Sequence, residues 1–108
     1  TCALPILTFL GDEPYNPVCE KYVRDCDWLL HEAFCLYVER DLWKPYEKHH
    51  STVKDACELA QAMQIPNLVL WHTEDSNVAG RERLYKSEGK KYYGGNIFVP
   101  DDESLIAL

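Results

Sequence analysis

Four residues whose side chains could bind a metal or exchange a proton stand at comparable places in the chain: Asp12, His31, His50 and His72. Three of them closely follow short apolar runs rich in β-forming residues, and His50 directly precedes a predicted helix start. Imidazole and carboxylate groups are common ligands of zinc, manganese and iron, and a carboxylate can bridge two such ions. The residue types therefore indicate a metal-assisted hydrolytic site.

The predicted topology brings these residues together. If helices connect the strands before Asp12, His31 and His72 in parallel, right-handed crossovers place the carboxyl ends of all these strands at one edge of the sheet. The helix that follows His50 begins at the same edge, because the chain leaves the second strand there. Glu32 is available nearby as the carboxylate that orients a histidine of the site.

Apolar runs and helical stripes alternate in the order βαβαβαββ, which predicts a single α/β domain over residues 1–108. Strands are expected at Leu4–Leu10, Asp27–Leu30, Leu68–Trp71, Asn96–Val99 and Ser104–Leu108. The last two strands are expected to pair as a hairpin that turns at Asp101-Asp102. The segment from His31 to His50 is long for a loop in so small a domain, so we expect it to be functional or partly helical.

Helices are expected between these strands. Thr52-x-x-Asp55 resembles a capping box, and it opens a stripe with helical spacing formed by Val53, Ala56, Cys57, Ala60 and Met63. An earlier helix is expected to place three residues on one face: Val18, Tyr22 and Cys26. A later helix is expected from Val78 to Ser87, with Gly89 as its terminator.

The composition narrows the function further. The 108 residues include 18 acidic and 11 basic side chains, for a formal net charge of −7. Tight binding of a phosphate backbone over the whole surface needs clustered Lys and Arg, so this charge argues against it.

No apolar run approaches the roughly 18 residues that span a bilayer, and no basic segment precedes an apolar one, so we expect a cytoplasmic protein with no membrane contact. The chain starts at Thr1, which suggests a piece of something longer.

Five cysteines, none of them in a C-x-x-C pair, predict reduced and mostly buried thiols. The thiol of Cys35 lies near His31 in the sequence, which leaves open a thiol-dependent enzyme. Such an enzyme would require an exposed Cys35 thiol with a low pKa.

Structural explanations are also open for the four candidate residues. Asp12 follows Gly11, as a turn former would. His31 and Glu32 could form a satisfied buried pair. His50, which precedes Ser-Thr, could simply flank a helix cap. A non-catalytic α/β interaction module is therefore the alternative to an enzyme.

The motifs in this order resemble the carboxyl-terminal half of metallo-β-lactamase-fold hydrolases, in the branch that contains RNase Z, the tRNA 3′-end processing endonuclease. The residues that carry the resemblance are Leu7–Asp12, a strand ending in G-D; Asp27–Ala33, a D-x-L-x-H-E-A strand; His50–Thr52, an H-S-T helix start; Leu68–His72; and Asn96–Leu108, a terminal hairpin. The resemblance implies half of an αββα sandwich, with a mixed sheet, crossover helices and a C-terminal hairpin.

Carried over residue by residue, the resemblance makes Asp12 a bridging metal ligand and His72 a terminal ligand of one metal. Glu32 and His50 would form a pair that donates a proton or steadies the scissile phosphate, and His31 would support the loop. The implied cofactor is two zinc ions, with manganese or iron as chemically permitted alternatives. Such ions would activate a bridging hydroxide.

Part of the family pattern lies outside this chain. The H-x-H-x-D-H cluster, which supplies most ligands and the general base, does not occur in the sequence. We therefore expect the 108 residues alone to be inactive and to need an N-terminal half of the same fold, in the same or a second chain. The complete protein is expected to be a homodimer that acts on a small phosphodiester, an RNA or another ester. Without the N-terminal half, an apolar sheet face should be exposed.

Overall fold

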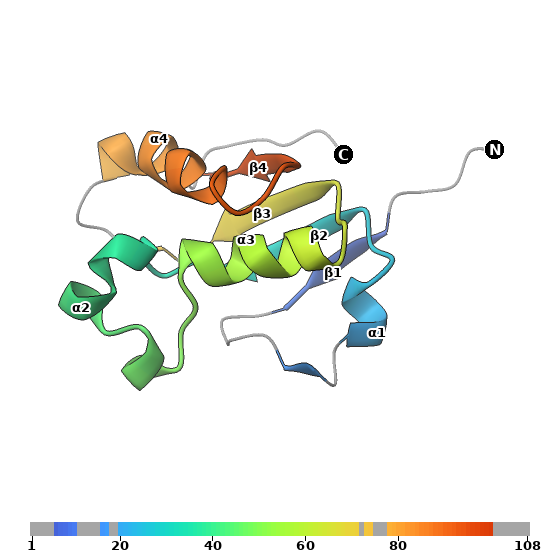
Figure 1. Ribbon diagram of the computed structural model, residues 1–108, viewed down its shortest axis with the longest axis horizontal. Helices are drawn as coiled ribbons and strands as arrows, with labels where there is room; N and C mark the ends of the chain where they lie inside the picture. The colour runs from blue at the N-terminus through green and yellow to red at the C-terminus, as the bar shows by residue number, and fades with distance from the viewer. Residues whose placement is uncertain (1–5, 11–15, 18–19, 72, 75–77, 101–108) are drawn as a thin grey trace.

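Four strands form one sheet in which the strand order follows the chain (Figure 1). The computed structural model describes residues 6–10, 16–17, 20–71, 73–74 and 78–100. The strands are β1 (Leu7–Phe9), β2 (Trp28–Glu32), β3 (Asn67–Trp71) and β4 (Asn96–Phe98). Each strand pairs with the next in parallel. The carboxyl ends of all the described strands therefore lie at one edge of the sheet, as expected.

The helices lie in the crossover connections. They are α1 (Glu20–Val23) between β1 and β2, α3 (Val53–Ala62) between β2 and β3, and α4 (Val78–Gly89) between β3 and β4. Between β2 and α3 the chain also forms three short helical turns: η2 (Tyr37–Glu39), α2 (Arg40–Trp43) and η3 (Tyr46–Lys48). The expectation of a partly helical segment before His50 is confirmed. None of the helices in the described ranges is long and apolar enough to cross a membrane.

The described strands of the sheet are all parallel, and they do not test the expectation of a mixed sheet. The strand expected at Ser104–Leu108, which would add the antiparallel partner, lies outside the described residues. β2 is longer than expected, so His31 and Glu32 are its last two residues and do not follow it. Consecutive strand residues point to opposite faces, so these two side chains separate.

The first helix is shorter than its sequence pattern suggests. α1 ends at Val23, which is buried, and Tyr22 is 61% exposed. Cys26 is buried but lies beyond the helix, where the helical period no longer applies. The prediction that Tyr22 and Cys26 share one helical face is therefore wrong, and Val18 lies outside the described residues.

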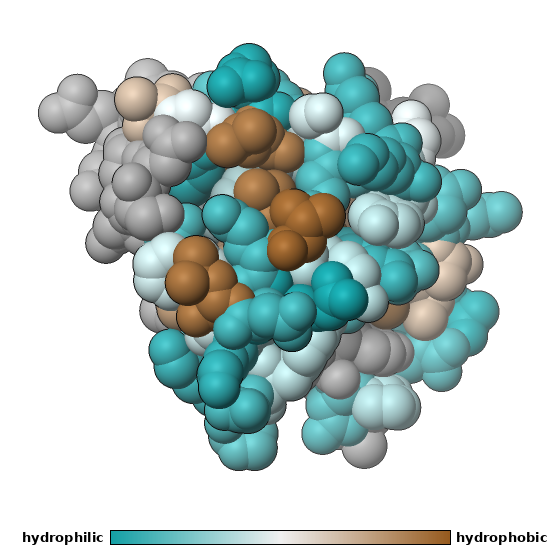
Figure 2. Space-filling model, turned by 60° about the vertical axis from the view of Figure 1, so that its left-hand side comes forward, coloured by the Kyte–Doolittle hydropathy of each residue, from teal (hydrophilic) through white to brown (hydrophobic). Residues whose placement is uncertain are grey.

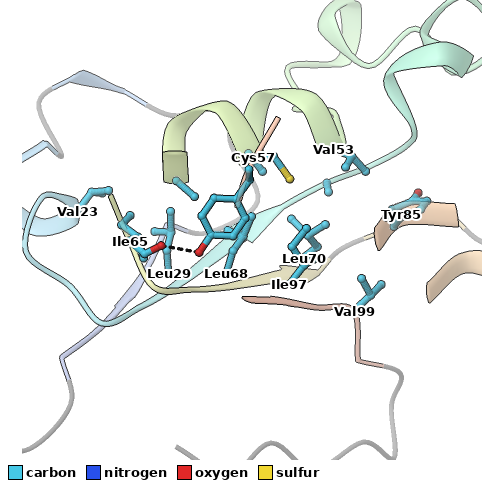
Figure 3. Close-up of a cluster of buried hydrophobic side chains, with 14 of the residues drawn as sticks. Val23, Leu29, Val53, Cys57, Ile65, Leu68, Leu70, Tyr85, Ile97 and Val99 are labelled. Carbon is cyan, nitrogen blue, oxygen red and sulfur yellow. Dashed lines mark hydrogen bonds between the residues drawn. The ribbon is translucent and has the colours of Figure 1, made fainter. Parts of the chain in front are cut away.

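The core lies between the sheet and the two longer helices, as Figure 3 shows. The α3 stripe is confirmed for its first four residues, which are fully buried and pack in one cluster with Leu68 and Leu70 of β3: Val53, Ala56, Cys57 and Ala60. Its expected last member, Met63, follows the helix and is only partly buried against the core. Burying one such Leu side chain contributes about 1.5–3 kcal/mol. The capping box is also confirmed: the Thr52 hydroxyl accepts the Asp55 N–H at 3.4 Å and the Asp55 carboxylate accepts the Thr52 N–H at 2.9 Å.

The opposite face of the sheet carries two aromatic pairs, one between β1 and β3 and one between β2 and β4, and each pair reaches across the strand that lies between. The rings of Phe9 and Trp71 lie 4.8 Å apart between centroids, and those of Trp28 and Phe98 lie 5.2 Å apart. Phe9 is 54% exposed and Leu7 is 45% exposed. An exposed apolar surface on this side of the sheet was expected from the sequence.

Candidate acid–base site

The carboxylate of Glu32 and the imidazole of His50 are in direct contact. His50 Nδ1–H donates a hydrogen bond to Glu32 Oε2 at 2.7 Å, and the backbone N–H of Ser51 donates to Glu32 Oε1, also at 2.7 Å. Glu32 is fully buried, whereas 20% of the His50 side chain is exposed. A buried carboxylate is tolerated when its oxygens accept hydrogen bonds, and a charged acceptor makes these bonds short and strong. Glu32 is therefore enclosed in the protein, whereas His50 reaches the surface.

A short parallel β-bridge joins the segment that follows Glu32 to the segment that follows His50. The Phe34 N–H donates to the Ser51 carbonyl at 2.9 Å, and the Val53 N–H donates to the Cys35 carbonyl at 3.1 Å. These bonds hold the chain that leaves β2 against the chain that enters α3. Two side chains that are 18 residues apart are thereby brought together by backbone hydrogen bonds.

The approach to His50 contains two residues in the left-handed region, Lys44 with φ 50° and His49 with φ 61°. This conformation is costly for residues other than Gly, Asn and Asp, so the surrounding turn must hold it. The His50 N–H donates to the carbonyl of buried Pro45 at 2.8 Å, which closes that turn. The side chain of His49 is exposed, and the hydrogen bond to Glu32 comes from His50.

His31 lies on the other face of β2 from Glu32, toward the helices. Its side chain is 1% exposed, and its Nδ1 is 2.7 Å from the Glu32 carbonyl oxygen, to which it donates. Burial lowers the pKa of His31, and the carbonyl contact and the charge of Asp55 partly oppose this. A neutral, enclosed imidazole cannot exchange protons with a bound substrate. The structure therefore encloses His31 in the core, and its role in supporting the loop stays a prediction from the resemblance.

The two expected metal ligands, Asp12 and His72, lie outside the described residues. Trp71, which precedes His72 in the sequence, is the register partner of Glu32 in the sheet. Within the described ranges, no group of three or more His, Cys, Asp or Glu residues could hold a metal ion. The candidate site that the structure describes is therefore the Glu32–His50 pair.

The thiol-dependent alternative is excluded by the surroundings of Cys35. Its side chain is fully buried, and burial, with smaller contributions from nearby carboxylates, raises the pKa of the thiol to about 12. The thiolate is the reactive form, so this thiol is inert near neutral pH. The expectation of reduced, buried thiols is confirmed for three cysteines: Cys26, Cys35 and Cys57. The other two cysteines, Cys2 and Cys19, lie outside the described residues.

The connection that leads to His50 also forms a groove with a volume of about 610 Å³, which sequence reasoning did not identify. Its lining residues are Tyr37, Arg40, Asp41, Lys44, Tyr46 and Glu47. The two cations and two carboxylates among these balance each other. A neutral lining gives no particular attraction for a phosphate backbone.

The sequence of the chain is similar to that of ribonuclease Z from several organisms. It is 31% identical over 100 residues to the enzyme of Ligilactobacillus salivarius, covering 93% of this chain and 31% of that protein. It is 34% identical over 102 residues to that of Pyrobaculum arsenaticum, covering 94% and 35%, and 34% identical over 100 residues to that of Bacillus cereus, covering 93% and 32%. The chain thus spans about a third of the length of these curated relatives. No family model matches the chain.

Solved structures give a matching result. The metallo-β-lactamase fold protein YhfI from Bacillus subtilis superposes with a TM-score of 0.70 at 17% identity, over 88% of this chain and 36% of that chain. A long form RNase Z from yeast superposes with a TM-score of 0.52 at 26% identity, over 64% of this chain and 9% of that chain. The four-stranded parallel sheet and its helices therefore match part of a metallo-β-lactamase fold, and the chain is related to ribonuclease Z.

Proposed function

We propose that this chain is the carboxyl-terminal half of a metal-dependent phosphodiesterase of the RNase Z type, in which His50 and Glu32 transfer a proton during cleavage. The observation that carries the proposal is the 2.7 Å hydrogen bond from His50 Nδ1 to the buried carboxylate of Glu32. The two residues lie in the H-E-A and H-S-T motifs, and the similarity to ribonuclease Z covers both motifs.

The geometry suits acid–base chemistry at the exposed side of the imidazole. Because Nδ1–H donates to Glu32, the other ring nitrogen, Nε2, is the atom that exchanges a proton with substrate. With Nδ1–H held by the Glu32 carboxylate, His50 can take up a proton at Nε2 and give it to the leaving oxygen, or place positive charge beside the phosphate. General acid–base catalysis of this kind is typically worth about 10²–10⁴-fold in rate.

A dinuclear zinc centre would take Asp12 and His72 from this chain; manganese and iron also suit carboxylate and imidazole ligands. Two protein ligands cannot complete the coordination of two metal ions. The described residues contain no cluster that would supply more ligands. The remaining ligands would come from an N-terminal half of the same fold, in the same or a second chain. When bound, the ions would supply Lewis-acid stabilisation of charge on the scissile phosphate.

The partner half would cover the aromatic sheet face opposite α3, where Phe9 is about half exposed. The complete protein is proposed to be a homodimer. Its substrate is a phosphodiester, either RNA or a small molecule. The net charge of −7 and the neutral lining of the groove between Tyr37 and Glu47 give no reason to favour RNA over a small phosphodiester.

Metal analysis of the natively purified protein, run beside intact mass, tests this proposal. We expect about two zinc or manganese ions per complex that contains both halves, and we expect Asp12→Ala and His72→Ala to lose them. His50→Ala should keep the metal and lose phosphodiesterase activity. A complex with both halves and no bound metal would contradict the proposal.

A non-catalytic interaction module is the second candidate, and one surface favours it. Val38 is 67% exposed and Leu42 is 70% exposed, on η2 and α2. Figure 2 turns the side of the molecule that carries α2 toward the viewer and shows apolar side chains set among hydrophilic ones. Exposed apolar patches often mark protein contacts. The metal content of the complete complex separates the two candidates, because an interaction module needs no metal.

A further inference from the structure

The imidazole of His50 is stacked on the ring of Phe34. The two ring centroids lie 4.9 Å apart and the ring planes are inclined by 19°. Phe34 is half-buried and lies just after Glu32 and Ala33, so the same stretch of chain provides both the hydrogen-bond acceptor and the stacking partner of His50.

Phe34 is itself held from several directions. Its N–H donates to the Ser51 carbonyl at 2.9 Å, and its carbonyl accepts the Glu74 N–H at 2.7 Å and the Tyr85 hydroxyl at 3.1 Å. The Trp43 ring meets the Phe34 ring edge-on, with centroids 6.5 Å apart and an angle of 87°. Lys48 Nζ lies 5.7 Å from the ring centroid. The ring therefore has a fixed backbone and an aromatic neighbour from α2.

The stacking and the hydrogen bond restrain different motions of the imidazole. Rotation about the Cβ–Cγ bond of histidine has broad energy wells, so a hydrogen bond alone leaves the ring plane loosely defined. Stacking defines the plane but permits a half-turn that exchanges Nδ1 with a ring carbon. The Glu32 carboxylate removes that half-turn, because it accepts only from Nδ1–H. Together the two contacts define a single orientation of Nε2.

We propose that Phe34, backed by Trp43, is a positioning residue that sets the plane of the His50 imidazole and so aims Nε2 at the substrate. This inference rests on the proposed function for its consequence in catalysis. The orientation of the ring can be measured without any activity.

NMR of the full chain with ¹⁵N-labelled histidine tests the orientation. In the unaltered protein, at a pH where the imidazole is neutral, we expect a single tautomer of His50 with the proton on Nδ1, and slow exchange of that proton with water. Phe34→Leu should mix the tautomers and speed the exchange by at least about ten-fold. Phe34→Tyr, which keeps a flat ring, should restore both properties. If Phe34→Leu does not fold, Phe34→Met removes the flat ring at similar volume.

Phe98→Leu is the matched control, because Phe98 forms a comparable aromatic pair with Trp28 on β2. It should leave the His50 tautomer and the Nδ1–H exchange unchanged. Equal changes in Phe34→Leu and Phe98→Leu, or none in Phe34→Leu, would overturn the positioning role.

In the complete enzyme, Phe34→Leu should lower kcat about ten-fold with KM unchanged. Altered tautomers with an unchanged kcat would overturn the proposed function of His50 and leave the positioning intact.

Discussion

The carboxylate of Glu88, in α4, accepts the backbone N–H of Tyr37, the first residue of η2, at 2.7 Å across 51 residues of sequence. Its second oxygen accepts the Val38 N–H at 3.3 Å. Glu88 is 5% exposed. The first N–H groups of a helical turn have no partner within it, so a carboxylate from a distant helix satisfies them here. This contact joins α4 to the segment that leads to His50.

Glu88→Ala should therefore destabilise the protein. Hydrogen bonds to a charged group contribute about 1.5–3 kcal/mol, and we expect a loss of about 2 kcal/mol in the free energy of unfolding, measured with urea. Glu82→Gln is the control, because Glu82 forms an exposed ion pair with Lys86 in the same helix. Such pairs contribute less than about 0.5 kcal/mol. Equal losses in the two variants would contradict the capping role of Glu88.

Gly89, the next residue, should not tolerate a side chain. A Cβ at this position would lie 2.8 Å from Ile97 Cδ1 and 2.9 Å from Cys57 Sγ. Overpacking of this kind typically costs about 1–3 kcal/mol, so Gly89→Ala should lower the midpoint of urea unfolding. Gly94→Ala is the control, because its Cβ would meet only Gln61 Oε1, at 3.8 Å. A Gly89→Ala variant as stable as the parent would show that α4 can move away from α3.

Acid should destabilise the fold through His31. Burial lowers the pKa of this histidine in the folded state, so below about pH 6.5 the unfolded chain binds more protons than the folded chain. The contribution of His31 to the free energy of unfolding should then be fully present above about pH 6.5. It should fall as the pH drops toward the pKa of His31 in the folded state. His31→Gln should flatten this slope. His49→Gln, which changes an exposed side chain, should keep it.

The buried thiols should resist alkylation until the protein unfolds. Burial raises the pKa of both Cys35 and Cys57 to about 12 from an ordinary value of 9.0. Iodoacetamide at about pH 8 should label them in urea and not in the folded chain, as peptide mass spectrometry would show. Because the unfolded chain loses these protons first, stability should also fall as the pH rises from about 9 toward 12. Fast labelling of folded Cys35 would reopen the thiol-dependent mechanism.

Local patterns predicted the parts of the structure whose interacting residues are close in sequence. In the capping box of Thr52 and Asp55 and in the buried stripe of α3, the residues that act together are three or four positions apart. At this spacing helical geometry alone decides the contact. The pairing of Glu32 with His50 was accessible through topology and resemblance, because the start of α3 returns to the carboxyl edge of β2.

Other contacts leave no such pattern. In the sequence, Phe34 is an ordinary apolar residue that follows a strand. Only the turn that ends at His49 brings the imidazole of His50 onto the ring of Phe34. The partnership of Glu88 with Tyr37 depends on how α4 packs, which no spacing of charges encodes. For α1 the helical period predicted a shared face for Tyr22 and Cys26, and this prediction was wrong because the helix ends after four residues.

The Glu32–His50 hydrogen bond makes the most direct prediction about catalysis. His50→Ala in the complete protein should lower kcat for a phosphodiester by about 10²–10⁴-fold, the usual contribution of a general acid. Glu32→Gln keeps the shape of the acceptor but replaces a charged acceptor of the Nδ1–H hydrogen bond with a neutral, weaker one, so it should lower kcat by a smaller factor. His49→Ala, next in the sequence but exposed, serves as control. Unchanged kcat in His50→Ala with metal retained would remove His50 from the mechanism, whatever the fold.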